Sequence, residues 1–176
     1  MHYYSRPLAV LFSFSFALVF LVACASVGRT INPAEQIRPG DVIKLNQRLT
    51  IPANMASVVL QNGQQQNGAS IDRFRASCRF VMHEIAKQQQ ILNPAEFTVT
   101  QVSYWKDIKT FGYGNMLSGP EFINYETTIR LHSDTQTAVH SLVCQHDDED
   151  DDGRHVWLSE MQQALGTVAR IIKRSP

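Results

Sequence analysis

The chain has 176 residues, and 16 Lys and Arg side chains balance 16 Asp and Glu side chains. The zero net charge excludes a basic nucleic-acid footprint and a broad electrostatic attraction to acidic lipid. The apolar share of 44% is ordinary for a globular protein and excludes wholesale disorder. No segment repeats with a period of about 20 to 50 residues, which excludes a solenoid.

The first 23 residues have the pattern of a secretory signal peptide. Arg6 is their only charged residue, and an uncharged run of 16 residues follows from Leu8 to Ala23. A basic start, an apolar stretch and a small residue before the cut are typical of such signals. The alternative is a retained membrane-spanning helix. Such a helix needs about 20 apolar residues, and the uncharged run here is shorter.

The four residues that close this run are Leu21, Val22, Ala23 and Cys24. They resemble the lipobox of bacterial lipoproteins. The resemblance implies that the Cys24 thiol receives a diacylglyceryl group and that signal peptidase II cuts after Ala23, freeing an amine for acylation. Several acyl chains on one residue anchor a protein stably, whereas one chain binds only marginally. We therefore expect the lipid bilayer to be a partner, through acylated Cys24.

The residue after the lipidated cysteine indicates the membrane to which a lipoprotein is sorted. In such lipoproteins of Gram-negative bacteria, Asp at this position usually causes retention in the inner membrane, and this chain has Ala25 there. The resemblance therefore implies the bacterial outer membrane, with the protein facing the periplasm.

Three segments follow from these patterns: a signal peptide at 1–23, a lipidated N-terminus with a flexible tether at 24–40, and a single globular periplasmic domain at 41–176. The tether is predicted because it has few large apolar residues and contains Pro33 and Pro39. The 153 residues after the signal peptide are enough for one domain with a real core.

Two cysteines remain once Cys24 is assigned to lipid. Cys78 and Cys144 form an even pair in an exported chain, where disulfides persist. Both lie in apolar stretches, so two separate buried thiols are the alternative to a bridge. No C-x-x-C spacing, which would favour a redox or metal pair, is present.

Seven segments are predicted to be strands from alternating or β-branched patterns. They are 41–45, 48–51, 56–61, 78–85, 97–105, 123–133 and 137–146. Asn62-Gly63 predicts a tight hairpin turn, and the short polar link 133–137 predicts an antiparallel hairpin of the last two strands. Residues 87–96 are interpreted as a turn or short helical piece, and 106–122 as a long surface loop.

The C-terminal residues have a helical period. Leu158, Met161, Leu165, Val168 and Ile172 recur at spacings of three and four, Ser159 and Gln162 match a capping box, and the last turn is basic. The expected fold class is therefore α+β: a curved antiparallel sheet or partial barrel of about six or seven strands, with one C-terminal helix that covers one face or end.

The acidic run 147–152 is a candidate calcium site. Asp148, Asp150, Asp152 and Gly153 match the first positions of an EF-hand loop, where alternating oxygen ligands converge on one hard cation. The twelfth position is Ser159 rather than Glu, and a strand rather than a helix precedes the run. A solvated loop between strand and helix is therefore the preferred interpretation, and no metal ligand is assigned.

Other candidate sites lack supporting context. The histidines at 132, 140, 146 and 155 do not have the spacing of a metalloprotease site. Ser118 and Ser141 lack the G-x-S-x-G pattern of a nucleophile, and Glu121 and Glu126 lack the setting of a glycosidase pair. Tyr104, Trp105, Phe111 and Tyr113 are a candidate aromatic binding patch on the long loop, with core packing as the alternative. No catalytic residue and no cofactor is predicted.

Several stretches resemble an uncharacterised group of proteobacterial exported proteins and lipoproteins. They are RLTIPANMASVVLQNG, CRF, YETTIRLHSD, LVCQH and EMQQALG, within 48–166. Since both cysteines fall in matched stretches, the resemblance favours pairing of Cys78 with Cys144. It transfers no activity.

The sequence thus favours a non-enzymatic, membrane-anchored envelope lipoprotein that binds a ligand or an envelope protein partner, through a sheet edge or the 106–120 loop. The alternatives are a metal-dependent envelope hydrolase and a subunit of a secretion or efflux assembly. No nucleic-acid partner is expected.

Replacing Cys24 by Ser should abolish acylation, because serine offers no thiol to the transferase. Radioactive or click-labelled fatty acid should then fail to label the protein, and residues 1–23 should stay attached. Normal labelling of Cys24→Ser would refute the lipid assignment.

Overall fold

The computed structural model describes residues 36–110, 121–149 and 155–174. They form an eight-stranded antiparallel sheet with the order β10-β1-β7-β8-β9-β5-β3-β4, a separate two-stranded sheet β2-β6, and one α-helix. The bounds are β1 (Val42–Leu45), β2 (Leu49–Ile51), β3 (Ser57–Gln61), β4 (Gln64–Gln66), η3 (Gly68–Ser70), β5 (Ser77–Met82), β6 (Gln90–Leu92), β7 (Ala95–Thr110), β8 (Glu121–His132), β9 (Val139–Asp148), α1 (Leu158–Leu165) and β10 (Ala169–Ile172).

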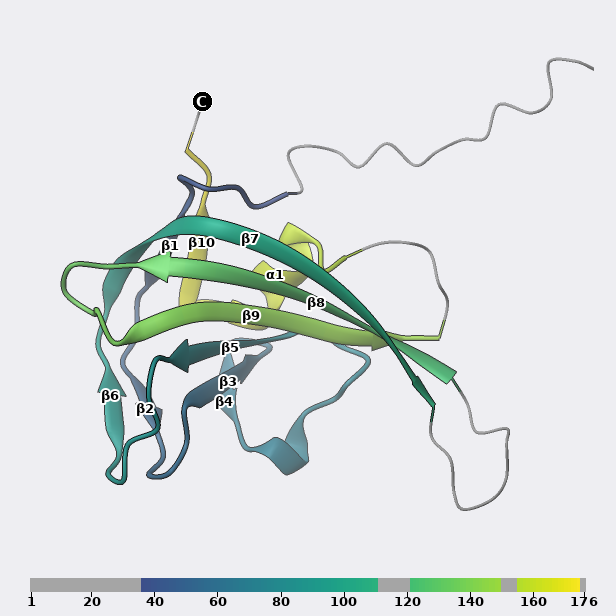
Figure 1. Cartoon of the computed structure of the whole chain (residues 1–176), viewed down its shortest axis with the longest axis horizontal. Helices are drawn as coiled ribbons and strands as arrows, with labels where there is room; N and C mark the ends of the chain where they lie inside the picture. The colour runs from purple at the N-terminus through teal and green to yellow at the C-terminus, as the bar shows by residue number, and fades with distance from the viewer. Residues whose placement is uncertain (1–35, 111–120, 150–154, 175–176) are drawn as a thin grey trace, which may run out of the picture. The chain divides into compact units, whose positions relative to one another are not determined.

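The large sheet curls, and α1 lies on its concave side (Figure 1). The helix contacts β10 at one end of the strand order and β3 and β5 near the other end. It therefore closes the open side of a partial barrel. The α+β class and the curved antiparallel sheet are confirmed, but the sheet has eight strands rather than six or seven. One strand that was missed, β4, consists of three glutamines and has no apolar alternation to reveal it.

The core lies between the concave face of the sheet and the helix. Alternate residues of β5, namely Cys78, Phe80 and Met82, are buried there as predicted, whereas Arg79 points to the convex face and is half-buried. The largest fully buried side chains come from both layers: Tyr125, Phe80, Phe97, Ile43, Leu45, Ile51, Leu60, Leu92, Ile129, Leu142, Met161 and Leu165.

A disulfide pair sits in the middle of this core. Cys78 and Cys144 are directly opposite in the β5–β9 register, and their Sγ atoms are 2.08 Å apart. This confirms both the pairing and the predicted adjacency of the two strands. Cys78 Sγ lies 3.9 Å from the carbonyl oxygen of Met161 in α1, so the bridge is covered by the helix. A covalent link over a loop of this length stabilises a fold by roughly 4 kcal/mol in the chain-entropy model.

The predicted long C-terminal helix is wrong beyond Leu165. The helix ends at Gly166, which has φ 55° and ψ −128°, and the chain continues into β10, which pairs with β1. A Cβ at Gly166 would lie 2.5 Å from the Cα of Gly63, so the β3–β4 turn blocks the path of a longer helix. The helix start is also shifted: Glu160, rather than Gln162, reaches back to accept a hydrogen bond from the backbone N–H of Trp157, at 2.8 Å.

Two glutamine side chains satisfy backbone groups at the ends of the sheet. The Gln162 amide donates to the Ala169 carbonyl at 3.0 Å and accepts from the Ile171 N–H at 2.9 Å, so it occupies the outer edge of β10. The Gln65 amide of β4 donates to the Thr50 carbonyl of β2 at 2.8 Å. These amides replace a neighbouring strand where an unpaired edge would otherwise be exposed.

Two interpretations of connecting segments are corrected. Residues 87–96 contain β6, which pairs antiparallel with β2 and buries Leu92. The strand β7 runs to Thr110, so the predicted loop does not begin at Lys106. Both segments are rich in polar residues, and pairing with a neighbouring strand decides their conformation. The β8–β9 hairpin is as predicted. The turn at Asn62-Gly63 is also as predicted, with the positive φ values of 52° and 71° that such a tight turn requires.

The packed domain begins before the predicted boundary at Asp41. Ile37 is 3% exposed and belongs to the core. The buried Asp41 carboxylate accepts hydrogen bonds from the Arg38 N–H, the Arg174 N–H and Lys173 Nζ. Burial raises the pKa of Asp41, but these hydrogen bonds outweigh it and hold the pKa below its usual value. The carboxylate thus ties the start of the domain to the residues that follow β10.

The predicted signal peptide, lipobox and Cys24 lie outside the described residues. Within 36–110, 121–149 and 155–174, no helix has the length and apolar character needed to span a membrane.

Gly166→Ala should destabilise the domain by at least about 2 kcal/mol, because alanine disfavours the Gly166 backbone conformation and its Cβ would collide with Gly63. Gly68→Ala is the matched control, since a Cβ there meets nothing within 4 Å. Urea unfolding of the oxidised protein measures both changes. Equal stability of the two variants would contradict the close approach of helix and turn.

Candidate functional site

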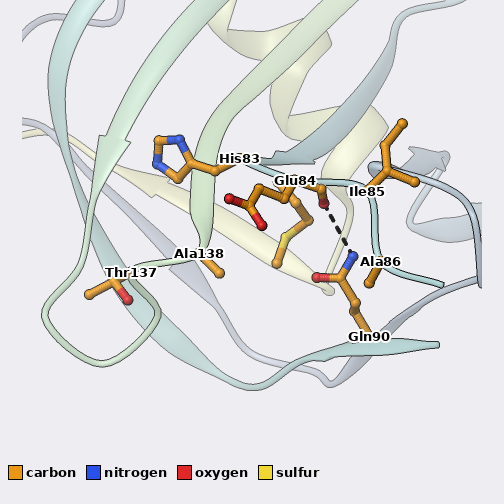
Figure 2. Close-up of a pocket in the computed structure, with 8 residues that line it drawn as sticks. His83, Glu84, Ile85, Ala86, Gln90, Thr137 and Ala138 are labelled. Carbon is orange, nitrogen blue, oxygen red and sulfur yellow. Dashed lines mark hydrogen bonds between the residues drawn. The ribbon is translucent and has the colours of Figure 1, made fainter. Parts of the chain in front are cut away.

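A pocket opens at the end of the sheet where β5 leaves it and the β8–β9 hairpin turns. Its volume is about 350 Å³. It is lined by Met82, His83, Glu84, Ile85, Ala86, Gln90, Thr137 and Ala138 (Figure 2). The lining combines apolar side chains with one carboxylate, one imidazole, one amide and one hydroxyl, which is the composition of many ligand pockets.

Backbone hydrogen bonds hold the two walls of the pocket together. The His83 N–H donates to the Ala138 carbonyl at 2.9 Å, which joins the segment after β5 to the β8–β9 turn. The Gln90 amide donates to the Glu84 carbonyl at 3.4 Å, and Figure 2 shows it turned toward that atom. Ile85 is 67% exposed at the mouth. The walls are therefore fixed, while the mouth presents a large apolar side chain to solvent.

The His83 ring packs edge-on against the His140 ring, with centroids 4.8 Å apart. Burial lowers the pKa of His140, and the neighbouring charges of Arg130 and His83 lower it further. The lowered pKa favours the uncharged form of the His140 ring. The pair lies beside the pocket, where a β-bulge interrupts the pairing of β5 with β9.

The hydrogen bonds of His140 fix its tautomer. Arg130 Nη1 contacts His140 Nε2, and arginine can only donate, so Nε2 is the acceptor. Nδ1 then carries the proton and donates to Ser141 Oγ, 3.2 Å away. A serine nucleophile needs the reverse arrangement, in which a histidine nitrogen accepts its proton. Ser141, which is also 2% exposed, is therefore not activated by this histidine.

Asp147, the first residue of the acidic run, makes structural contacts. The Asp147 carboxylate is 6% exposed, lies 2.6 Å from Arg73 Nε and accepts a hydrogen bond from the Asn124 amide at 2.7 Å. Its charge is thus already matched by a cation. Asp150, Asp152 and Gly153 lie outside the described residues. Within the described ranges, no group of three or more His, Cys, Asp or Glu side chains is arranged to hold a metal ion.

The remaining histidines of the sequence prediction are spread over the fold. His132 pairs with Asp134 at 3.2 Å on the surface, and the His146 ring packs 5.6 Å from Tyr125. The His155 ring lies 4.4 Å from the Tyr104 ring and 5.3 Å from the Trp157 ring. Burial lowers the pKa of His155, and the charge of Glu160 only partly offsets this.

The predicted aromatic patch is not formed by its two described members. Tyr104 is opposite Thr127 on the concave face, and Trp105 is opposite Glu126 on the convex face. Both residues lie in the predicted strand 97–105, and successive residues of a strand point to opposite faces. Phe111 and Tyr113 lie outside the described residues.

Glu126 is also engaged: it accepts from Arg79 Nη2 at 3.2 Å and from Thr128 Oγ1 at 3.0 Å. Its predicted partner Glu121 is the first residue of β8, and its side chain lies outside the described part of the structure.

The sequence analysis missed the pocket itself. Its residues come from three separate segments, and none carries a motif. The strongest available signal was the polar segment HEIAKQQQ directly after a buried strand, which is typical of a loop at a sheet end.

Comparison of this chain with protein-family models, with curated proteins and with solved structures found no match. The likeness to exported lipoproteins therefore stays a prediction.

The lowered pKa values of His140 and His155 predict an acid-sensitive fold. In the unfolded chain these rings gain protons near pH 6.5, whereas the folded state resists protonation. Their contribution to the stability of the fold is complete above that pH and is lost as the pH falls through the lower pKa values of the folded state. Melting temperatures should therefore drop by a few degrees between pH 7 and 5. His155→Phe should reduce this dependence, and an unchanged slope would contradict the assignment.

Proposed function

We propose that this chain is a non-enzymatic binding protein of the bacterial outer membrane, anchored by acylated Cys24 and facing the periplasm. The pocket between the segment after β5 and the β8–β9 turn is the proposed binding site. An accessory role in envelope assembly follows from a lipid anchor combined with a binding domain.

The observation that carries this proposal is the pocket, whose lining joins apolar side chains to the exposed Glu84 carboxylate. The other candidate reactive groups among the described residues are engaged elsewhere. The acceptor nitrogen of His140 is occupied by Arg130, Asp147 is held by Arg73, and Glu126 is held by Arg79. Catalytic acids and bases need an unoccupied atom directed at a substrate. Glu84 lines the pocket and is exposed, which suits its carboxylate to contact a bound ligand.

The lining favours a ligand with a cationic or hydrogen-bond-donating group next to an apolar part. The Glu84 carboxylate suits the cation, and Met82 and Ile85 suit the apolar part. A basic segment of an envelope protein has this chemistry and is the preferred partner. A volume of about 350 Å³ takes one or two side chains rather than a folded element.

A photo-crosslinking residue at Ile85 in the full, membrane-anchored chain tests the site. It should give a discrete adduct in intact cells, and the same residue at the exposed Gln64, on the β3–β4 hairpin, should not. Glu84→Arg should reduce the adduct at least about tenfold, since it reverses the charge offered to the ligand. Equal adducts with and without Glu84→Arg, in proteins of equal melting temperature, would refute the proposal.

A further inference from the structure

Basic side chains form a row on the outer face of the sheet, across three strands. Lys44 of β1 is opposite Arg170 of β10 on one side and opposite Glu96 of β7 on the other. Its neighbours Ile43 and Leu45 belong to the core, so Lys44 points outward. Residues that are opposite each other in paired strands share a face, so the three charged side chains form one row. Lys44 Nζ lies 2.8 Å from the Glu96 carboxylate, and the row therefore holds two cations and one anion.

A second group of charges lies where the first and last described residues meet. The Asp41 carboxylate accepts a hydrogen bond from Lys173 Nζ at 2.8 Å. It also accepts from the backbone N–H groups of Arg38 and Arg174. Lys173 Nζ contacts the carbonyl oxygen of Gln36 as well. Figure 1 shows the start of the described chain beside the C-terminal strand.

Arg174 connects the two groups. Its backbone N–H binds Asp41, and its charge acts on Glu96. The hydrogen bond from Lys44 and the charges of Lys44, Arg174 and Arg170 lower the pKa of Glu96, so three cations act on one carboxylate. Among the described residues, neither the Arg170 nor the Arg174 guanidinium forms an ion pair.

The two groups together are called the basic end. It contains five cations and two carboxylates, namely Arg38, Lys44, Arg170, Lys173 and Arg174 with Asp41 and Glu96, and all five cationic side chains reach solvent. The surplus of three positive charges is local, because the chain as a whole is neutral. Like charges directly opposite in a sheet, as Lys44 and Arg170 are, destabilise strand pairing. An anionic surface against the basic end would offset this repulsion.

The place of the basic end along the chain indicates which anionic surface it meets. Gln36 follows Cys24 by 12 residues, which span at most roughly 40 Å when fully extended. A lipid anchor on Cys24 therefore keeps the basic end within that distance of a bilayer. A short tether raises the effective concentration of the groups that it joins, so that individually weak contacts become effective. Lys and Arg side chains near an anionic bilayer are attracted to its headgroups.

We propose that the basic end docks the domain on the anionic phospholipid headgroups of the bilayer that holds acylated Cys24. This docking rests on the proposed lipid anchor and adds an orientation, which a flexible anchor alone does not set. The headgroup phosphates lie against Arg170 and Arg174. The basic end shares no residue with the pocket between Met82 and Ala138, so docking and ligand binding use separate surfaces.

Fluorescence quenching by headgroup-labelled lipid measures the docking of the full, acylated chain. A fluorophore on Pro39→Cys marks the basic end, since Pro39 is exposed beside Arg38. A fluorophore on Ala69→Cys marks the exposed η3, which is drawn at the bottom of Figure 1 while the C-terminus is at the top. In vesicles of phosphatidylcholine and phosphatidylglycerol in equal parts, spin-labelled headgroups should quench the Pro39 label more than the Ala69 label. In pure phosphatidylcholine this difference should disappear.

Charge reversal identifies the residues that dock. Arg170→Glu combined with Arg174→Glu should lower the equilibrium constant for docking at least about tenfold, because both guanidinium groups become repulsive to phosphate. Lys87→Glu combined with Lys109→Glu is the matched control: it changes the net charge equally at exposed positions outside the basic end, and should dock like the wild type. Arg170→Gln combined with Arg174→Gln, which introduces no new charge, should give a smaller loss. Melting temperatures check that every variant is folded.

Mass spectrometry of Cys24 separates the docking from the anchor. Without acyl chains on Cys24, the anchor is wrong and the docking falls with it. With acyl chains present, the anchor stands, and the docking is overturned by any of three results. These are equal quenching at Pro39 in neutral and anionic vesicles, equal docking of the wild type and the folded Arg170→Glu, Arg174→Glu variant, or an equal loss in the Lys87→Glu, Lys109→Glu control.

Discussion

The structure depends on the fit of one short helix into the open side of a curled sheet. Gly166 approaches Gly63 so closely that no side chain fits between them, and the Gly63 N–H donates to the Ala164 carbonyl at 3.0 Å. The Gln162 amide completes the edge of β10, and Met161 covers the disulfide of Cys78. The eight residues of α1, with Gly166 after them, therefore cover the core, satisfy a sheet edge and hold β3 in place. Without them the sheet would expose its concave face.

This closure determines what remains available for binding. β5 pairs with β9 from Ser77 to Met82, and the disulfide links one pair of this ladder. The segment after β5 therefore meets the β8–β9 turn, where the pocket lies. On the convex face, charged residues are used between neighbouring strands, as in the contact of Arg79 with Glu126. The long hairpin β7–β8 extends past β1, which pairs with β7 from Ala95 to Thr98. The pocket at the end of β5 is thus a consequence of how the sheet is paired.

The sequence revealed the parts that local patterns encode. Alternation identified β5, β8 and β9, the pair Asn62-Gly63 identified a tight turn, and cysteine counting identified the bridge. Prediction from the sequence failed where tertiary contacts decide the local conformation. Val168 and Ile172 fit a helical stripe equally well, but the contact of Gly166 with Gly63 stops the helix and pairing with β1 makes a strand. The pocket could not be predicted, because its lining comes from separate segments that only the pairing of β5 with β9 brings together.

Native-state hydrogen exchange tests the central claim that the helix closes the sheet as one cooperative unit. The amides of Met161 and Gly166 are bonded to Trp157 and Gln162 within the helix, and Leu142 lies in the buried centre of β9. If the helix is integral to the fold, the amides of Met161, Gly166 and Leu142 exchange with the same free energy of opening. Much faster exchange at Met161 and Gly166, with Leu142 still protected, would show that the helix opens separately and would contradict this account.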